Sequence, residues 1–209
     1  MKNLKIIMFL SLCFSLAISH AASLTKENYA HLWSILLYRG QTVKENLNKI
    51  IFNGKRTYVH ENVYSAELSR IFYQNNFLSF QIAGNIASRI AASKYYNGSH
   101  PIFEEDIYVK LYYLAFPWNR WINTTVGVGE GISYTNELPC PEKDCYSGRN
   151  SKKLLDFMTF EITMGLPAYP QWQIVGRIHH RSGAFGVFAT KKGSPGSNVL
   201  GLGIRCFFG

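Results

Sequence analysis

The chain has 209 residues, enough for one domain with a substantial core, and aromatic residues make up 15% of it. Its 22 Lys and Arg residues outnumber 13 Asp and Glu residues, so the formal net charge is +9. This balance favours an anionic partner, and for an exported chain we expect lipid head groups rather than nucleic acid. No apolar run after residue 22 is long enough for a membrane-spanning helix, which excludes a helical membrane protein.

The N-terminus has the pattern of a secretory signal peptide over residues 1–21. Two lysines precede an apolar stretch at 6–18, and Ser19-His20-Ala21 fits the small-x-small cleavage pattern. The apolar stretch is too short for a comfortable transmembrane helix. We therefore expect export, with residues 22–209 forming a single domain.

The rest of the chain contains eight segments in which apolar and polar residues alternate, the pattern of half-buried β-strands. The first is the short apolar run 32–38. A polar connection at 40–56 follows, in which 42–51 could form a helical turn or two. Further strands are expected at 58–72, 77–88, 104–116, 121–134, 153–166, 171–186 and 197–208. Their connections alternate long and short, which is typical of a transmembrane up-and-down barrel with both termini on one side.

The two faces of these strands differ in the way that an outer-membrane barrel requires. One face carries bulky apolar side chains that we expect to point at lipid, and these include Leu78, Val109, Val126, Phe160, Ile174 and Leu202. The other face carries Glu161 and Arg177, expected to pair inside a narrow, filled lumen. A glycine series, Gly127, Gly129 and Gly131, would make room there for tyrosines or for curvature.

A soluble lipocalin-like barrel, with the apolar face turned inward around a ligand, is the structural alternative. Two features favour the membrane. Charges of both signs on the polar face can pair inside the barrel, and the chain ends Arg-Cys-Phe-Phe-Gly, close to the aromatic ending of outer-membrane barrels. The pattern therefore predicts an eight-stranded antiparallel transmembrane β-barrel in the bacterial outer membrane.

Two cysteines, Cys140 and Cys145, bracket Pro-Glu-Lys-Asp in the longest expected loop, 135–152. In an oxidising compartment we expect them to form a disulfide that closes this loop. A metal site is the alternative, but further ligands at suitable spacing are lacking, so no metal or other cofactor is expected.

The candidate site is His180 and Ser182, which continue the apolar face of 171–186 at its C-terminal end, on the long-loop side. Polar groups on an apolar face are costly unless they are paired or used. A histidine that acts as general base can activate a serine hydroxyl for attack on an ester carbonyl. Although an isolated His-x-Ser on a strand is usually accidental, this placement indicates hydrolysis of a lipid ester. Backbone N–H groups around Gly183 and Ala184 are candidates for an oxyanion hole.

The stretch His180-Arg181-Ser182-Gly183-Ala184, one strand before the C-terminus, resembles the His-x-Ser-x-Ala motif of the outer-membrane lipid A 3-O-deacylase family (PagL). The resemblance is concentrated in residues 174–208. It implies a carboxylic ester hydrolase that removes an acyl chain from lipid A, with Ser182 as nucleophile and His180 as base.

The chain departs from that family at the third member of the triad. The family has an acidic residue shortly after the last outer loop, and the matching position here is Asn198. We expect Asn198 to face outward beside His180 on the neighbouring strand. An amide oxygen can orient a histidine, but it cannot give the imidazolium a full negative charge.

Two functional classes remain open. One is a deacylase that acts on lipid A, or lipopolysaccharide, in the outer leaflet. The other is a non-catalytic barrel that binds lipid or an adhesive partner through the loops 40–56 and 135–152. A soluble exported lipid carrier is a weaker third option, and a homodimer is left open.

Overall fold

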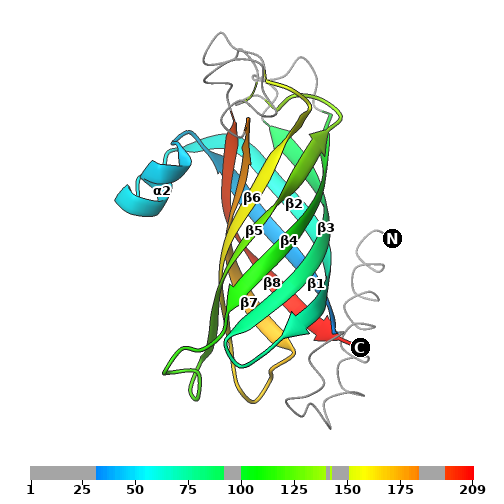
Figure 1. Ribbon diagram of the computed structural model, residues 1–209. Coiled ribbons are helices and arrows are strands. Elements are labelled where there is room, and N and C mark those ends of the chain that lie inside the picture. Colours follow the sequence, from blue (N-terminus) through cyan, green and yellow to red (C-terminus); the bar gives the residue numbers. More distant parts are fainter. Residues whose placement is uncertain (1–31, 92–99, 140–141, 143–150, 184–195) are drawn as a thin grey trace, which may run out of the picture.

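A computed structural model describes residues 32–91, 100–139, 142, 151–183 and 196–209 of the chain. Eight antiparallel strands close into a barrel in chain order, and β1 pairs with both β2 and β8 (Figure 1). The predicted fold class is therefore confirmed. The expected signal peptide and both cysteines of the expected disulfide, Cys140 and Cys145, lie outside the described residues.

The strands are β1 (Trp33–Val43), β2 (Tyr58–Gln74), β3 (Leu78–Ala91), β4 (Ile102–Tyr113), β5 (Asn123–Thr135), β6 (Leu154–Gly165), β7 (Trp172–Ser182) and β8 (Ser197–Phe208), and one helix, α2 (Leu47–Asn53), lies between β1 and β2. No helix in this described part of the chain could span a membrane.

The first strand is longer than predicted, because residues 40–43 belong to β1 and not to the connection. Pairing with β8 continues up to Val43, which lies opposite Asn198. A neighbouring strand that offers backbone partners outweighs a locally polar composition. The helix then starts at Leu47 and ends before Gly54, whose φ of 62° is the left-handed conformation that favours glycine at a helix C-terminus.

The exterior of the barrel is apolar, as predicted. All six side chains expected to face lipid lie on the outward face and are half-exposed or exposed, and Leu202 reaches 66% exposure. Exposed aromatic side chains mark both ends of this belt, with Trp33, Trp118 and Trp121 at the short-turn end and Tyr58, Phe103 and Tyr134 at the long-loop end. Such girdles flank the hydrocarbon region of outer-membrane barrels. The inward-facing apolar lining of a lipocalin-like barrel is thereby excluded, and the belt places the barrel in the bacterial outer membrane.

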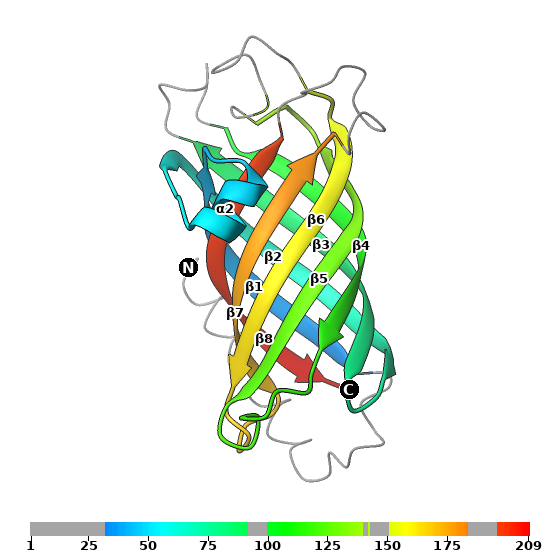
Figure 2. The ribbon, with the colours of Figure 1, turned by 60° about the vertical axis from the view of Figure 1, so that its left-hand side comes forward.

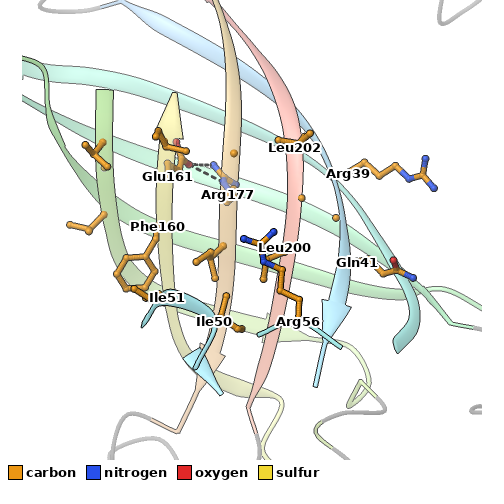
Figure 3. Close-up of a pocket in the computed structure, with 18 of the residues that line it drawn as sticks. Arg39, Gln41, Ile50, Ile51, Arg56, Phe160, Glu161, Arg177, Leu200 and Leu202 are labelled. Atoms are coloured by element: carbon orange, nitrogen blue, oxygen red, sulfur yellow. Dashed lines mark hydrogen bonds and ion pairs between the residues drawn. The ribbon is translucent and has the colours of Figure 1, made fainter. Parts of the chain in front are cut away.

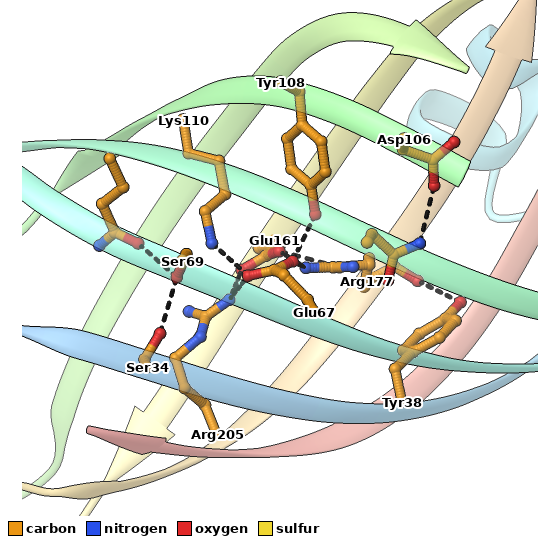
Figure 4. Close-up of polar contacts among 12 residues, drawn as sticks. Ser34, Tyr38, Glu67, Ser69, Asp106, Tyr108, Lys110, Glu161, Arg177 and Arg205 are labelled. Carbon is orange, nitrogen blue, oxygen red and sulfur yellow. Dashed lines mark hydrogen bonds and ion pairs between the residues drawn. The ribbon is translucent and has the colours of Figure 1, made fainter. Parts of the chain in front are cut away.

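The middle of the lumen is filled by a network of buried charges (Figure 4). Arg177 Nε donates to Glu161 Oε1 at 2.8 Å, and Arg205 donates to Glu161 Oε2 at 2.7 Å, so the predicted Glu161–Arg177 pair is confirmed. Glu67 accepts from Arg177 and Lys110. Burial of an unpaired charge costs several kcal/mol, roughly, of desolvation free energy. In this network each charged group lies beside groups of opposite charge, which offsets that cost.

Small residues on β5 make room for two tyrosine rings, as expected. A Cβ atom at Gly127 would overlap Cδ1 of Tyr112, and one at Gly129 would lie 3.1 Å from Cδ2 of Tyr108. Both rings are buried, and both hydroxyls donate to carboxylates of the lumen network. Glycine is therefore required on this inward face by close packing.

The connections separate by length between the two ends of the barrel. Those after β2, β4 and β6 are short and lie at the end where the chain terminates, whereas strands β1, β3, β5 and β7 finish at the other end (Figure 1). Helix α2 belongs to the long-loop end and lies outside the barrel wall (Figure 2). The C-terminal end of β7, which carries the candidate site, is at this same end.

Candidate functional site

Three adjacent strands bring polar side chains together on the apolar exterior, near the long-loop end. His180 and Ser182 lie on the outward face of β7. Asn198 on β8 is the direct register partner of His180, and Asp156 on β6 is the direct partner of Ser182. The predicted residues are thus brought side by side, and an aspartate joins them.

The histidine is oriented by a chain of two hydrogen bonds. Asn198 Nδ2 donates to the backbone oxygen of Glu45 at 2.9 Å, which leaves Asn198 Oδ1 as the acceptor. His180 Nδ1 lies 2.7 Å from that oxygen, so Nδ1 carries the proton. Nε2 of the neutral ring then holds the free lone pair, which is the state that a general base needs.

The carbonyl of Glu45 is itself fixed at the start of the β1–β2 connection. The Glu45 carboxylate accepts from Thr57 N at 2.7 Å and from Thr57 Oγ1 at 2.6 Å, which closes the base of this connection. These hydrogen bonds lower the pKa of Glu45 below its usual value. The Glu45 carboxylate is therefore charged at neutral pH, and the two hydrogen bonds from Thr57 act as a clamp on this connection.

Asn198 is more enclosed than predicted. We expected it at the open outer surface, but only 6% of it is exposed although it lies on the outward face. The reason is the contact with the β1–β2 connection, which crosses the start of β8 at Glu45. The sequence pattern fixes the face of a strand, but it does not show which loop covers that face.

The serine has an acidic neighbour that the sequence analysis missed. Ser182 Oγ donates to Asp156 Oδ2 at 3.3 Å. Asp156 is nearly buried and also shares a hydrogen bond with Glu130 on β5. Phe160 and Met158 are outward positions of β6, and the next outward position in the same two-residue series is Asp156. The alternation could therefore have revealed a carboxylate on the lipid-facing surface.

The two oxyanion candidates are only partly described. Gly183 follows directly after the end of β7 and is half-buried, whereas Ala184 lies outside the described residues. A glycine directly after Ser182 would leave the backbone open to a substrate. The oxyanion role of both residues stays a prediction.

The neighbouring His179 belongs to the lumen and not to this site. Its Nε2 lies 2.5 Å from Glu104 Oε1, and together with Asp106 these residues have the spacing of a possible metal-binding group. Glu104 already receives Nε of Arg89 at 2.5 Å and lies 3.6 Å from NH1 of Arg181. Two guanidinium groups beside the same carboxylate disfavour a cation, so we interpret the group as part of the ion-pair network.

Neither a protein-family model nor a curated protein sequence matches the chain. Among solved structures, the chain is similar to the outer membrane enzyme PagL, with a TM-score of 0.53 and 12% identity over 83% of this chain and 98% of that one. It is also similar to Neisserial surface protein A, with a TM-score of 0.49 and 12% identity over 84% of this chain and 95% of that one. At these identities the likeness shows the fold alone, which is that of the eight-stranded outer-membrane barrels.

Proposed function

We propose that this protein is an outer-membrane lipid esterase that removes an ester-linked acyl chain from lipid A, with residues 1–21 as its export signal. One observation supports this most directly. The hydrogen bond from His180 Nδ1 to Asn198 Oδ1, with the Asn198 amide fixed by the Glu45 carbonyl, leaves His180 Nε2 as a base on a lipid-facing surface. A surface embedded in the outer leaflet meets lipopolysaccharide without the lipid leaving the membrane.

The reaction follows from these groups. His180 Nε2 takes the proton of Ser182 Oγ while that oxygen attacks the ester carbonyl. The tetrahedral intermediate collapses as its C–O bond to the sugar breaks, and the imidazolium returns the proton to the leaving alkoxide. Water, activated by the same histidine, then hydrolyses the acyl-serine and releases a fatty acid. Backbone N–H groups at Gly183 and Ala184 would stabilise the oxyanion.

Asp156 supplies the negative charge that Asn198 lacks. The imidazolium formed during attack is stabilised in Ser-His-Asp enzymes by a carboxylate, and an amide is a weaker substitute. Asp156 lies beside Ser182 on β6, the strand that flanks β7 on the side opposite Asn198. In this arrangement, orientation and charge compensation come from two different residues on two different strands.

The test is lipid A mass spectrometry before and after expression in a Gram-negative host. We expect the wild-type protein to produce lipid A that lacks one acyl chain. Ser182→Ala and His180→Ala should each lower the rate by roughly 10⁴-fold or more. Because both side chains lie outside the lumen, the variants should still assemble as heat-modifiable barrels, as should the control Ile174→Ala on the same face of β7.

An inert wild-type protein would contradict the proposal. If folded wild-type barrels leave lipid A and soluble model esters unchanged, the non-catalytic barrel becomes the better account. Lipid or a partner would then bind at the outer loops.

A further inference from the structure

A cavity of about 340 Å³ lies at the short-turn end of the barrel, and we call it the vestibule. It is bounded by the β2–β3 turn at Asn75 and Asn76, by the β6–β7 turn at Gln171, and by the inward side chains of Gln81 and Gln173. The short turns of outer-membrane barrels face the periplasm, so the vestibule faces that compartment. Its size lies within the range of about 300–1,000 Å³ that is usual for the sites of small molecules.

The vestibule is polar, yet its lining carries a single charge. Most of its polar side chains are amides, and Ser79 and Thr125 add hydroxyl groups. The charge is that of Arg205, and no carboxylate belongs to the described residues that line the cavity. An amide side chain offers donors and an acceptor, which match those of a peptide group. The lining therefore complements a molecule that has amide groups and a negative charge.

Gln173 is a buried amide whose hydrogen bonds are open to a ligand. It is only 8% exposed and lines the vestibule, but its side chain forms no hydrogen bond with any residue that the structure describes. By contrast, the amide of Gln81 lies 3.4 Å from the hydroxyl oxygens of Ser69 and Ser79. Buried polar groups in native structures are generally hydrogen-bonded, so an exception indicates a partner from outside the chain.

Arg205 links the vestibule to the charge network of the lumen. It lines the vestibule, while its Nη2 donates to Glu161 Oε2 at 2.7 Å and lies 3.5 Å from Glu67 Oε1. Its Nε is buried and has no acceptor among the described residues. A carboxylate at the inner end of the vestibule would supply that acceptor, and hydrogen bonds between a guanidinium and a carboxylate are among the strong ones.

The network itself has one more positive charge than negative charges. Its cations are Arg177, Arg205 and Lys110, and its carboxylates are Glu67 and Glu161, of which Glu161 is shown paired with Arg177 in Figure 3. The other buried ion pairs of the described lumen lie nearer the long-loop end. A ligand with a single negative charge would balance the excess. This favours a carboxylate over a phosphate monoester, whose charge is about −1.5 to −2.

We propose that the vestibule binds a short periplasmic peptide through its free C-terminal carboxylate. The carboxylate accepts from Arg205, the last peptide group pairs with the amide of Gln173, and the apolar part of the peptide lies against Leu114 and Phe207, which also line the cavity. The inference goes beyond the proposed esterase function and does not depend on it, because Ser182 lies at the opposite end of the barrel.

The first experiment compares ligands on the folded wild-type barrel in lipid nanodiscs. We expect acetyl-alanyl-alanine with a free carboxylate to bind saturably with a Kd below about 1 mM, measured by NMR titration. The same dipeptide with a C-terminal carboxamide should bind at least roughly 10-fold more weakly, because it lacks the charge. Equal affinities of the acid and the carboxamide would overturn the proposal. Gluconate or inorganic phosphate that binds as tightly as the acid would overturn a peptide as the ligand.

The second experiment removes the open amide. Gln173→Leu should weaken binding of the free acid by roughly 2-fold to 10-fold. Gln41→Leu is the matched control, because Gln41 lies on the outward face of β1 near the long-loop end, and it should bind as wild type does. An unchanged affinity in Gln173→Leu, or an equal loss in both variants, would contradict the proposed site. Ser182→Ala should also bind as wild type does, which separates this inference from any failure of the esterase function.

The third experiment tests the contact with the carboxylate. Arg205→Lys keeps a positive charge near Glu161 but lacks the Nε–H donor. We expect the acid to lose affinity while the carboxamide does not, so that the ratio of their Kd values changes by at least roughly threefold. An unchanged ratio would mean that the carboxylate binds elsewhere, and the proposal would be wrong. If this variant does not assemble, the comparison of acid and carboxamide on the wild-type barrel decides the proposal.

Discussion

The charge of Asp156 offers the sharpest test of the proposed mechanism. Asp156→Asn keeps the size of the side chain and its ability to accept a hydrogen bond from Ser182 Oγ, which lies 3.3 Å from Oδ2. It removes the one full negative charge that we assign to stabilising the His180 imidazolium. The adjacent Asn198 provides only an amide oxygen on the other side of the ring.

The size of the effect follows from the type of interaction that is lost. Hydrogen bonds to charged groups contribute about 1.5–3 kcal/mol, against about 1 kcal/mol for neutral ones. Each loss of about 1.36 kcal/mol of transition-state stabilisation lowers the rate about tenfold. The variant loses the difference between these two values, so we expect kcat/KM to fall by roughly 2-fold to 30-fold.

The assay compares kcat/KM for a soluble short-chain ester and for lipid A in detergent micelles. Adding Asn198→Asp to the Asp156→Asn variant should recover part of the rate, because the charge returns on the other side of His180. Recovery should be incomplete, since the new carboxylate loses the hydrogen bond from Asn198 Nδ2 to the Glu45 carbonyl. Asn198→Glu should recover less in this enclosed position, where an additional methylene must be accommodated.

Glu105→Gln is the control for loss of a carboxylate from the outward face. Glu105 lies on β4, two strands from Asp156, so its effect should be small. A rate within twofold of wild type for Asp156→Asn would refute charge compensation. A faster Asp156→Asn enzyme would also refute it, because that result would mean that the aspartate holds the serine away from its base.

Three further predictions concern the barrel and its outer connection. Gly127→Ala should lower the free energy of unfolding in urea by about 1–3 kcal/mol, because its Cβ would overlap the ring of Tyr112, whereas Gly84→Ala should have little effect at a position with open space. Glu161→Gln should destabilise the barrel by about 3–5 kcal/mol, measured in the same assay, by leaving two buried arginines short of negative charge. The hydrogen bonds from Thr57 lower the pKa of Glu45 below its usual value of 4.5. The contact between Glu45 and Thr57 should therefore be intact above pH 4.5 and should open as the pH falls through the lowered pKa. Hydrogen exchange across residues 44–57 should accelerate only in that acidic range, and acceleration near pH 7 would contradict the assignment.

Much of the architecture was predictable because a barrel strand has a two-residue period. The outward positions of Val109, Ile174 and Leu202, and the inward Glu161–Arg177 pair, follow from alternation once the apolar face is assigned to lipid. The same alternation placed His180 and Ser182 on the exterior. The pairing of β7 with β8, which follow one another in the chain, then places Asn198 beside His180.

Other parts of the site depend on contacts that alternation does not encode. Asp156 lies 26 residues before Ser182, and strand register alone makes the two side chains neighbours. Glu45 reaches Asn198 because closure of the barrel pairs β1 with β8, which are at opposite ends of the sequence.

The sequence by itself determined which face of each strand meets lipid, and hence that a histidine and a serine lie together on the outside of a barrel. This information is local, because the side-chain period of a strand is fixed by its backbone. Only the tertiary structure decided the tautomer of His180, the carboxylate beside Ser182 and the contact of Asn198 with the Glu45 carbonyl. Each of these depends on barrel closure, register between strands and the path of a connection, and these are set by the summed pairing of the whole sheet.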